Sequence, residues 1–564
     1  MVVIDTEQVR RLIEAGESFT VEFKSDNQRL SDHDLCENVV CLANADGGVI
    51  LVGVENDGRV TGAKPRHDGT TEPRKIQAMI FNNTVPPINT RVGVHRIGAA
   101  DVLAVEVDAY PAICATSDGK TLRRVDGIDG PECRPFLPHE HTSRRSDLGL
   151  LDYSAQRIAG TTWDDLDPLE IERLRQTIAR RSGERTLQEL DNADLVQALQ
   201  LVESRDGGLV PNTAGMLLLG REPAIRQALP THEVAFQVLD DRGNVQVNDW
   251  FHGPLLRTLE EIELRFRARN EEREAIVGLI RLPIPDYAPD AFREALNNAV
   301  VHRDYARRGA VHVQLYPDHL SVINPGGFVE GIRLDNLLVH EPKPRNQRLA
   351  SAFRRIGLVE TTGRGIDRIF EGQLRYGRPM PDYSASDREA VRLTLRGGDS
   401  SLEFAIFVYE QDRAGNRLSL EDLIVLDQLQ YERRLSAETV ASFIQRDETR
   451  ARAILERLVE RGLIEAIGNA RRRSYHLSAM LYRRFGTPSG YVRLRGVDAI
   501  QQESMILAYV TAHGRITRRE VKALCGIEDH QARYLLQRLV RENKLRQRGK
   551  RRGAYYELHL DDTP

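Results

Sequence analysis

Acidic residues near the N-terminus are the first side chains in this chain that could carry chemistry. Glu17 and Glu22 lie in the segment ESFTVEFK, which ends with Lys24, and Glu55 and Asp57 follow in GVENDG. Grouped carboxylates can hold Mg²⁺ or Mn²⁺, and the metal then activates water and stabilises charge that develops on a phosphate. The alternative is structural, with Glu17 capping a strand and Glu22 facing solvent.

A second polar group lies in the segment FREALNNAVVHRDY, which is predicted to be a helix. Glu294 and Asn298 are four residues apart, so their side chains share one face of that helix. Two strands, VHVQLY and LSVIN, and a glycine-rich turn follow it. The pattern predicts a polar pair held beside a sheet.

The third group is basic and lies in the C-terminal part of the chain. Two stretches, near 418–477 and 499–558, share an order of short helices and a basic hairpin, which predicts a weak repeat of a winged helix-turn-helix. Residues 501–557 contain 13 Lys and Arg against 6 Asp and Glu. In such units a helix enters the DNA major groove and the hairpin contacts phosphates. The candidate phosphate contacts are Arg471, Arg472, Arg473, Arg548, Lys550, Arg551 and Arg552.

The two basic units differ, and winged helices also mediate contacts between proteins. The predicted recognition helix of the first unit begins with Asp447 and Glu448. Because acidic side chains repel phosphates, the second unit is predicted to bind DNA better.

Alternating and helical periodicities predict the elements that position these groups. Residues 1–15 are predicted to be a helix, and FTVEFK, GGVILVGV and VLAVEVDAY to be strands. Ser31 is predicted to start a helix, with Asp34 as the acid of a capping box. The apolar run AGMLLLG is predicted to be a buried strand, and LLRTLEEIELRFRARNEER a long charged helix.

The composition fits a soluble, multidomain protein. Hydrophobic residues make up 41% of the 564 residues and the formal net charge is −4, so any nucleic-acid surface must be local. The five cysteines are odd in number and widely spaced, which argues against a disulfide framework and favours the cytoplasm. No apolar run is long enough to span a bilayer, so no membrane association is expected.

The N-terminal motifs resemble those of the Schlafen/AlbA_2 family. That family shows an E-x4-E-F-K strand, then N-x-x-G-G, then G-V-[DE]-[DN]-D-G, and all three occur here in order over roughly the first 140 residues. Some eukaryotic members are metal-dependent ribonucleases with three carboxylates. The resemblance then implies Glu17 and Glu22 as the first two metal ligands, with Glu55 or Asp57 as the third. Many bacterial relatives are regarded as DNA-binding regulators instead.

The helix with Glu294 and Asn298 resembles the first box of the GHKL ATPase superfamily, which includes gyrase, Hsp90, histidine kinases and MutL. The resemblance implies that Glu294 orients the attacking water and that Asn298 ligates Mg²⁺. Asn297, one position earlier, is the alternative metal ligand. His302, at the end of this segment, is assigned to the same nucleotide site.

Two glycine-rich segments complete the resemblance to a nucleotide site. NPGG, with Asn324, Gly326 and Gly327, stands where the superfamily has D-x-G-x-G at the adenine, so Asn324 replaces the usual aspartate. TTGRGIDRI matches the second glycine-rich box, whose N–H groups would bind phosphates. Its candidate residues are Thr362, Gly363, Arg364 and Gly365.

The run RNQRLASAFRRIGLVETTGRGIDRIF resembles a C-terminal segment that has led some divergent bacterial proteins to be labelled RecG-like helicases. A helicase is not expected here. The single GK[ST] motif is Gly119-Lys120-Thr121, and the first glycine of a P-loop would fall on Cys114.

The sequence thus predicts an α/β multidomain protein with five regions. These are a Schlafen/AlbA_2 domain (1–150), a bridging α/β segment of the ATP module (155–285), a GHKL-like α/β sandwich (286–400) and two winged helices (410–485 and 495–560). The favoured function is a cytoplasmic, homo-oligomeric, ATP- and Mg²⁺-binding regulator that binds DNA or RNA. The alternatives are a metal-dependent nuclease acting in stress or anti-phage defence, with Mg²⁺ or Mn²⁺, and a non-catalytic scaffold.

Overall fold

The computed structural model describes residues 4–127, 130–181, 183–205, 207–277, 280–359, 364–397, 401–432, 434–468 and 473–485. Further along the chain it describes residues 503, 506–507, 509–511, 514–525, 529–542, 544–548 and 555–558. Helices and sheets alternate throughout, and separate hydrophobic cores form along the chain, so the predicted mixed α/β, multidomain organisation is confirmed.

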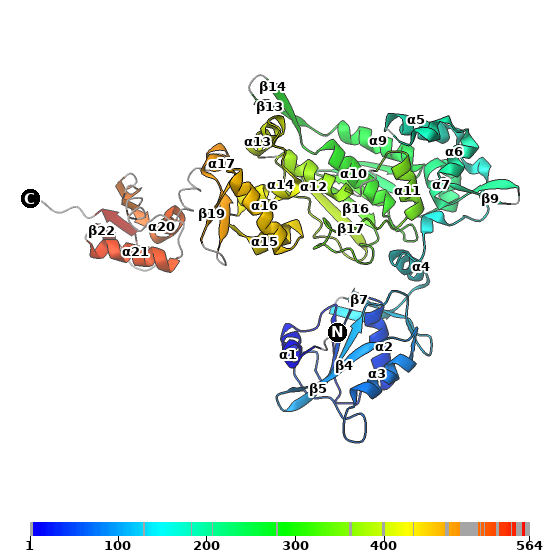
Figure 1. Cartoon of the computed structure of the whole chain (residues 1–564), viewed down its shortest axis with the longest axis horizontal. Coiled ribbons are helices and arrows are strands. Elements are labelled where there is room, and N and C mark those ends of the chain that lie inside the picture. The colour runs from blue at the N-terminus through cyan, green and yellow to red at the C-terminus, as the bar shows by residue number, and fades with distance from the viewer. Residues whose placement is uncertain are drawn as a thin grey trace, which may run out of the picture.

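The N-terminal domain is a four-stranded sheet with helices on both faces (Figure 1). Its elements are α1 (Thr6–Ala15), β1 (Val21–Lys24), α2 (Asp32–Ala43), β2 (Gly47–Val52), α3 (Pro73–Asn82), β3 (Thr84–Val85), β4 (Thr90–Ile97), β5 (Ala100–Asp108), β6 (Ala115–Thr116), β7 (Leu122–Gly127) and β8 (Gly130–Pro135). The strand order is β1-β2-β5-β4, in which only the β1–β2 pair is parallel. α2 and α3 cover one face and α1 the other.

Local signals predicted this domain well. The expected helix near the N-terminus and the three expected strands are present. Ser31 is the N-cap of α2, and its hydroxyl accepts a hydrogen bond from the Asp34 N–H at 3.0 Å.

The cysteine argument was wrong for one pair, because Cys41 on α2 and Cys133 on β8 are joined in a disulfide. The two residues are 92 positions apart, and only the packing of the β7–β8 hairpin beside α2 brings them together. Cys36 and Cys114 are buried free thiols, and Cys525 is also buried.

Helix α4 (Pro138–Asp147) leads from this domain to a helical region. That region contains η1 (Tyr153–Ala155), η2 (Trp163–Asp165), α5 (Pro168–Arg180), η3 (Arg185–Glu189), α6 (Asn192–Ala198), β9 (Val202–Arg205), β10 (Gly208–Pro211), α7 (Thr213–Leu219) and α8 (Glu222–Ala228). The run AGMLLLG, predicted to be a strand, is the helix α7. It is buried on every side, so its sequence shows no amphipathic period by which a helix could be told from a strand.

The central domain is built on a five-stranded sheet with the order β12-β11-β15-β16-β17. Its elements are β11 (Val234–Leu239), β12 (Val245–Phe251), α9 (Leu255–Arg267), β13 (Glu272–Val277), β14 (Ile280–Pro285), α10 (Pro289–Val301), β15 (Val311–Leu315), β16 (His319–Pro325), α11 (Gln347–Arg355), α12 (Gly365–Arg375) and β17 (Ala390–Arg396). Strands β11 and β12, from the predicted bridging segment, therefore belong to the same sheet as β15 and β16. The helix predicted from residue 255 ends at Arg267, and the chain continues into β13.

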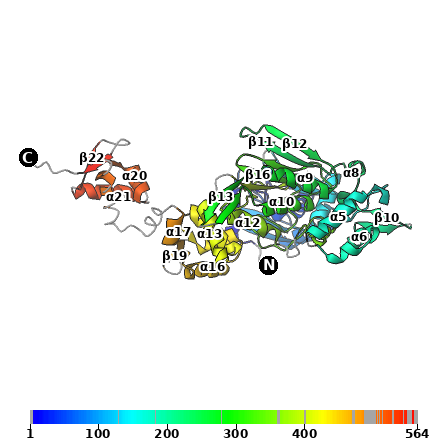
Figure 2. The ribbon, with the colours of Figure 1, turned by 90° about the horizontal axis from the view of Figure 1, so that it is seen from above.

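Helices α9, α10 and α12 pack on one face of this sheet (Figure 2). Residues 326–346, which connect β16 to α11, contain neither a regular helix nor a further named strand, and we call them the lid loop. The loop begins at the end of β16, beside α10, so it can cover a cavity that lies between α10 and β16.

Two units follow the central domain. The first contains α13 (Leu402–Arg413), α14 (Leu420–Tyr431), β18 (Leu435–Ser436), α15 (Ala437–Ile444), α16 (Glu448–Glu460), β19 (Ile464–Ile467), β20 (Ser474–Leu477) and α17 (Ala479–Arg484). The second contains β21 (Ile516–Thr517), α20 (Arg518–Cys525), α21 (Asp529–Arg541), β22 (Leu545–Arg548) and β23 (Tyr555–Leu558) and lies at one end of the long axis (Figure 1). Among the described residues, no helix is both long and apolar enough to cross a membrane.

Candidate functional site

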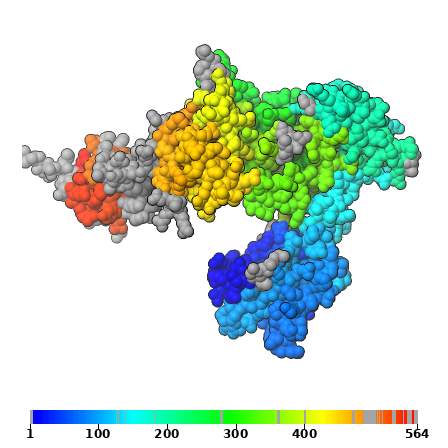
Figure 3. All heavy atoms as spheres, viewed as in Figure 1, coloured from blue at the N-terminus to red at the C-terminus, as the bar shows by residue number. Residues whose placement is uncertain are grey.

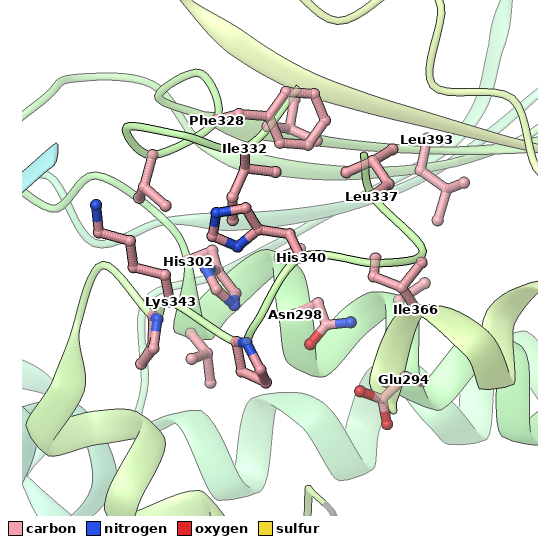
Figure 4. A pocket seen from close by; sticks show the side chains of 18 of the residues that line it. Glu294, Asn298, His302, Phe328, Ile332, Leu337, His340, Lys343, Ile366 and Leu393 are labelled. Atoms are coloured by element: carbon pink, nitrogen blue, oxygen red, sulfur yellow. The ribbon is translucent and has the colours of Figure 1, made fainter. Parts of the chain in front are cut away.

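A cavity of about 690 Å³ lies between α10, β16, β17, the start of α12 and the lid loop. α10 supplies Glu294, Asn298 and His302 along one side of it (Figure 4). The three residues are spaced by four positions, so the period of the helix alone places them in a row on the cavity side. Lid residues Phe328 and Leu337 lie on the opposite side.

The first residue of α12 packs directly against the polar pair of α10. A Cβ atom on Gly365 would lie 2.2 Å from Glu294 Oε1 and 3.4 Å from Asn298 Nδ2. A glycine is therefore needed there for the buried carboxylate of Glu294 to keep its position. Arg364, which precedes it, also lines the cavity, whereas Thr362 and Gly363 lie outside the described residues.

Asn324 at the end of β16 is the most informative polar group in the cavity. Its side chain is 5% exposed, and Oδ1 has no hydrogen-bond partner among the described residues. A buried amide without a partner costs free energy, which a ligand with a complementary donor would recover. The site therefore fits a ligand with a polar edge at this end and anionic or metal-bound groups near Glu294 and Asn298.

The two glycines after Asn324 use their N–H groups within the protein. Gly326 donates to the Glu389 carbonyl at 2.8 Å and Gly327 to the Arg388 carbonyl at 3.1 Å. Gly326 has φ +96°, and a Cβ on Gly327 would lie 2.8 Å from the Asp387 carbonyl oxygen. Their role in this structure is thus the tight turn and the close approach of two backbones.

His302 is neutral at physiological pH. Burial at the bottom of the cavity, aided by the positive charge of Arg345, lowers its pKa to about 4. It can therefore offer an uncharged imidazole to a ligand but not a cation.

Arg345 connects the cavity rim to the linker helix α4. It is 3% exposed and forms ion pairs with Asp147 at 2.5 Å and with Asp304 at 3.5 Å. Its Nη2 also donates to the Gly327 carbonyl at 2.7 Å. The residue that stabilises the glycine turn is thus also bound to the segment that leads to the N-terminal domain.

The lid loop is held by the first C-terminal unit. The Leu338 N–H donates to Gln445 Oε1 at 2.7 Å, and Gln445 Nε2 donates to the Leu334 carbonyl at 2.8 Å. Gln445 lies in the turn between α15 and α16 with φ +54°. Leu338 also packs against the hydrophobic core of this unit. Sequence analysis missed this contact, because nothing local links residues 107 positions apart.

The four N-terminal carboxylates of the predicted metal site are each engaged by groups of the protein. Glu17 Oε1 accepts the Phe23 N–H at 2.8 Å, and Glu22, 6% exposed, pairs with Arg124 and with Lys24. Glu55 accepts hydrogen bonds from the side chains of Ser25, Asn27 and Thr61. Asp57 is exposed, accepts the Arg59 N–H and pairs with the Arg59 side chain at 3.9 Å.

Each of these four acids is thus used within the protein, and a metal would have to replace Arg124 and Lys24 at Glu22. No group of three or more His, Cys, Asp or Glu side chains in the described part of the chain is placed to hold a metal ion. The nuclease alternative stays a prediction.

Two of the seven basic candidates lie on described residues. Arg473 pairs with Glu456 at 2.8 Å, and Arg548 pairs with Glu557. The remaining five fall outside the described residues; they are Arg471, Arg472, Lys550, Arg551 and Arg552.

Comparisons with known families assign two of these regions. Residues 17–131 match the Schlafen, AlbA_2 family. Residues 309–395 match the family HATPase_c_4, which is described as putative ATP-dependent DNA helicase recG C-terminal. The chain therefore combines a Schlafen/AlbA_2 domain with an ATPase-type domain, as the motifs predicted.

Two further segments match family models. Residues 145–235 match a domain of unknown function (DUF8451), and residues 502–558 match the FaeA-like protein family. No curated protein matches the chain. Among solved structures, the DIP2311 protein from Corynebacterium diphtheriae is 22% identical, with 98% of each chain covered and a TM-score of 0.49.

Proposed function

We propose that this protein is an ATP-binding regulator that binds nucleic acid through its C-terminal units, with the bound nucleotide controlling that binding. The observation that supports ATP best is the cavity itself. Its lining includes Asn324, whose Oδ1 has no hydrogen-bond partner among the described residues, together with Glu294 and Asn298 on adjacent turns of α10.

Each of these residues has a defined role in the proposal. Asn324 binds the base, Asn298 holds Mg²⁺, and Glu294 orients a water molecule toward the terminal phosphate. Mg²⁺ would neutralise the phosphate charge when bound. The start of α12 faces the phosphates, where the N–H groups of its first turn would bind them.

The two C-terminal units are proposed to be winged helix-turn-helix domains. In the first, α15 and α16 are joined by a tight turn and followed by the β19–β20 hairpin, which is the order a winged helix requires. The basic side chains of α16 are engaged within the unit, since Arg450 pairs with Glu421 and Arg452 with Glu448. The second unit, with its excess of Lys and Arg, is therefore the proposed main DNA contact.

Gln445 provides the proposed coupling between the two activities. Closure or opening of the lid loop moves Leu334 and Leu338, whose backbone is bonded to the turn before α16. Nucleotide occupancy and the position of a DNA-binding helix then depend on each other, and the dependence is reciprocal.

Isothermal titration calorimetry with ATP and Mg²⁺ tests the first part of the proposal. Wild type is expected to bind, and Asn298→Ala is expected to bind at least about tenfold more weakly because the metal loses an oxygen ligand. Asn248→Ala, an exposed residue on β12, is the matched control. Absence of binding to folded wild type would refute ATP binding, and phosphate release measures hydrolysis separately.

Gel shifts on duplex DNA test the coupling. DNA affinity is expected to change with ATP or a non-hydrolysable analogue in wild type but not in Asn298→Ala. Equal DNA affinity in all conditions would refute the coupling while leaving nucleotide binding intact. DNA binding that is insensitive to salt would argue against phosphate contacts altogether.

A further inference from the structure

The floor of the cavity around Asn324 is aliphatic. On strand β16 Val322 lies two residues earlier and points to the same face, and Val391 of β17 pairs with Asn324 across the sheet. Leu393, paired with Val322, completes this patch, and all four residues line the cavity. The floor is thus a flat apolar surface with a single carboxamide at one edge.

Such a surface is complementary to a planar heterocycle that has hydrogen-bonding atoms on one edge. The ring would cover the aliphatic side chains, and its polar edge would meet Asn324. Because Oδ1 has no hydrogen-bond partner among the described residues, a hydrogen bond to this oxygen remains for the ligand to supply.

A carboxamide differs from a carboxylate in having both a donor and an acceptor. A 6-amino purine presents a donor at position 6 and an acceptor at N1. A 6-oxo purine presents an acceptor at position 6 and a donor at N1. Rotation of the Asn324 amide by about 180° matches both atoms of either edge, whereas a carboxylate has acceptors only and therefore meets one acceptor on each edge, N1 of a 6-amino purine or the 6-oxo oxygen of a 6-oxo purine.

We propose that Asn324 makes the cavity accept 6-amino and 6-oxo purine nucleotides with similar affinity. The inference rests on the proposed nucleotide site and specifies which nucleotides occupy it. A nucleotide that differs from ATP only at the 6-position and N1 is therefore an equal ligand for this protein.

Calorimetric titration of the full chain with ATP, inosine triphosphate and purine riboside triphosphate tests this inference. Inosine triphosphate carries the 6-oxo edge without the 2-amino group of guanine, so it isolates the contact with Asn324. We expect the dissociation constants of ATP and inosine triphosphate to agree within about threefold. Purine riboside triphosphate, which lacks the 6-substituent, should bind about tenfold more weakly.

Two variants assign the effect to Asn324. Asn324→Asp should weaken both nucleotides by about tenfold or more, because a carboxylate meets an acceptor on either edge, and Asn324→Leu should also weaken both. Asn248→Asp makes the same chemical change on the exposed strand β12 and should leave both affinities at their wild-type values. Thermal denaturation checks that each variant is folded.

The outcomes separate the two proposals. If wild type binds ATP but prefers it over inosine triphosphate by about thirtyfold or more, the inference is wrong and the ATP site stands. The same holds if Asn324→Leu is folded and binds both nucleotides as tightly as wild type does. If folded wild type binds none of the three nucleotides, the nucleotide site itself is refuted.

Discussion

Glu22 on β1 and Arg124 on β7 form a buried ion pair. The pair shows that an acidic side chain, considered alone, does not reveal whether its role is catalytic or structural. Arg124 is 1% exposed, and its Nη2 donates to the Ser18 carbonyl at 3.1 Å. Removing one member of a buried pair leaves an uncompensated charge. Loss of activity in a Glu22 variant would therefore not by itself identify a catalytic carboxylate.

Glu22→Ala is accordingly expected to destabilise the N-terminal domain by about 3–5 kcal/mol. Glu7→Ala, which removes an exposed carboxylate paired with Arg10 and Arg11, should cost less than about 1 kcal/mol. Thermal unfolding followed by circular dichroism measures both. A second change, Arg124→Leu, should restore part of the loss. A Glu22→Ala protein of wild-type stability would contradict the structural role and favour the nuclease alternative.

Asp427 on α14 gives a pH-dependent prediction. Burial raises its pKa to about 7, although a hydrogen bond from Gln428 acts in the opposite direction. The folded chain therefore keeps a proton that the unfolded chain releases near pH 4, so the stability that depends on this group falls as the pH rises from about 4 to 7.

Asp427→Asn should remove the loss of stability that accompanies the rise in pH. We expect the variant to be more stable than wild type by about 2–4 kcal/mol at pH 8, with a smaller difference at pH 5. Thermal unfolding at both pH values is the measurement, with the exposed Asp335→Asn as the control. An equal effect of Asp427→Asn at both pH values would show that the carboxyl does not titrate in this range.

At the scale of elements, the turn between α15 and α16 serves two purposes. It ends α15 with a residue in the left-handed region, and it presents the Gln445 side chain to the lid loop. Glycine adopts that conformation without strain. Gln445→Gly therefore removes the contact with the lid while keeping the turn.

The expected result for Gln445→Gly is faster release of nucleotide and loss of the ATP effect on DNA affinity. The winged helix itself should remain as stable as in wild type. Stopped-flow displacement of a fluorescent ATP analogue measures the first effect, and gel shifts measure the second. If coupling persists in this variant, the lid and the first C-terminal unit communicate by another route.

For the whole molecule, the N-terminal domain forms a separate lobe that meets the central domain at few points (Figure 3). Arg388 pairs with Asp46 at 2.5 Å, and its Cζ lies 3.5 Å from the centre of the Phe19 ring. Arg144 of α4 pairs with Glu330 of the lid loop at 2.6 Å. Because Arg388 also accepts the Gly327 N–H through its carbonyl, this contact lies at the rim of the cavity.

Arg388→Asp should release the N-terminal domain from the central domain. We expect a larger radius of gyration in small-angle X-ray scattering and faster proteolysis near α4, because a favourable ion pair becomes a repulsive one. The double variant Asp46→Arg/Arg388→Asp restores the pair with reversed charges and should recover the compact form. No change in either measurement would show that the α4 contacts alone hold the lobe.

Much of the local structure followed from the sequence alone. The i, i+4 spacing of Glu294 and Asn298 placed both on one face of a helix, and Ser31 with Asp34 fixed the start of α2. The NPGG motif marked Asn324 as a departure from the superfamily pattern. These are short-range signals, which depend on backbone geometry within a few residues.

Other features were decided by tertiary structure alone. The AGMLLLG run is a helix whose burial on every side hides the helical period from the sequence, and Cys41 and Cys133 are joined because β8 packs beside α2. The Glu22 side chain is buried because Arg124, which is 102 residues away in the sequence, packs against it and pairs with it. Gln445 reaches the lid only once two domains have packed together. Such contacts leave no period or motif in the sequence, because their partners are brought together by the folding of the whole chain.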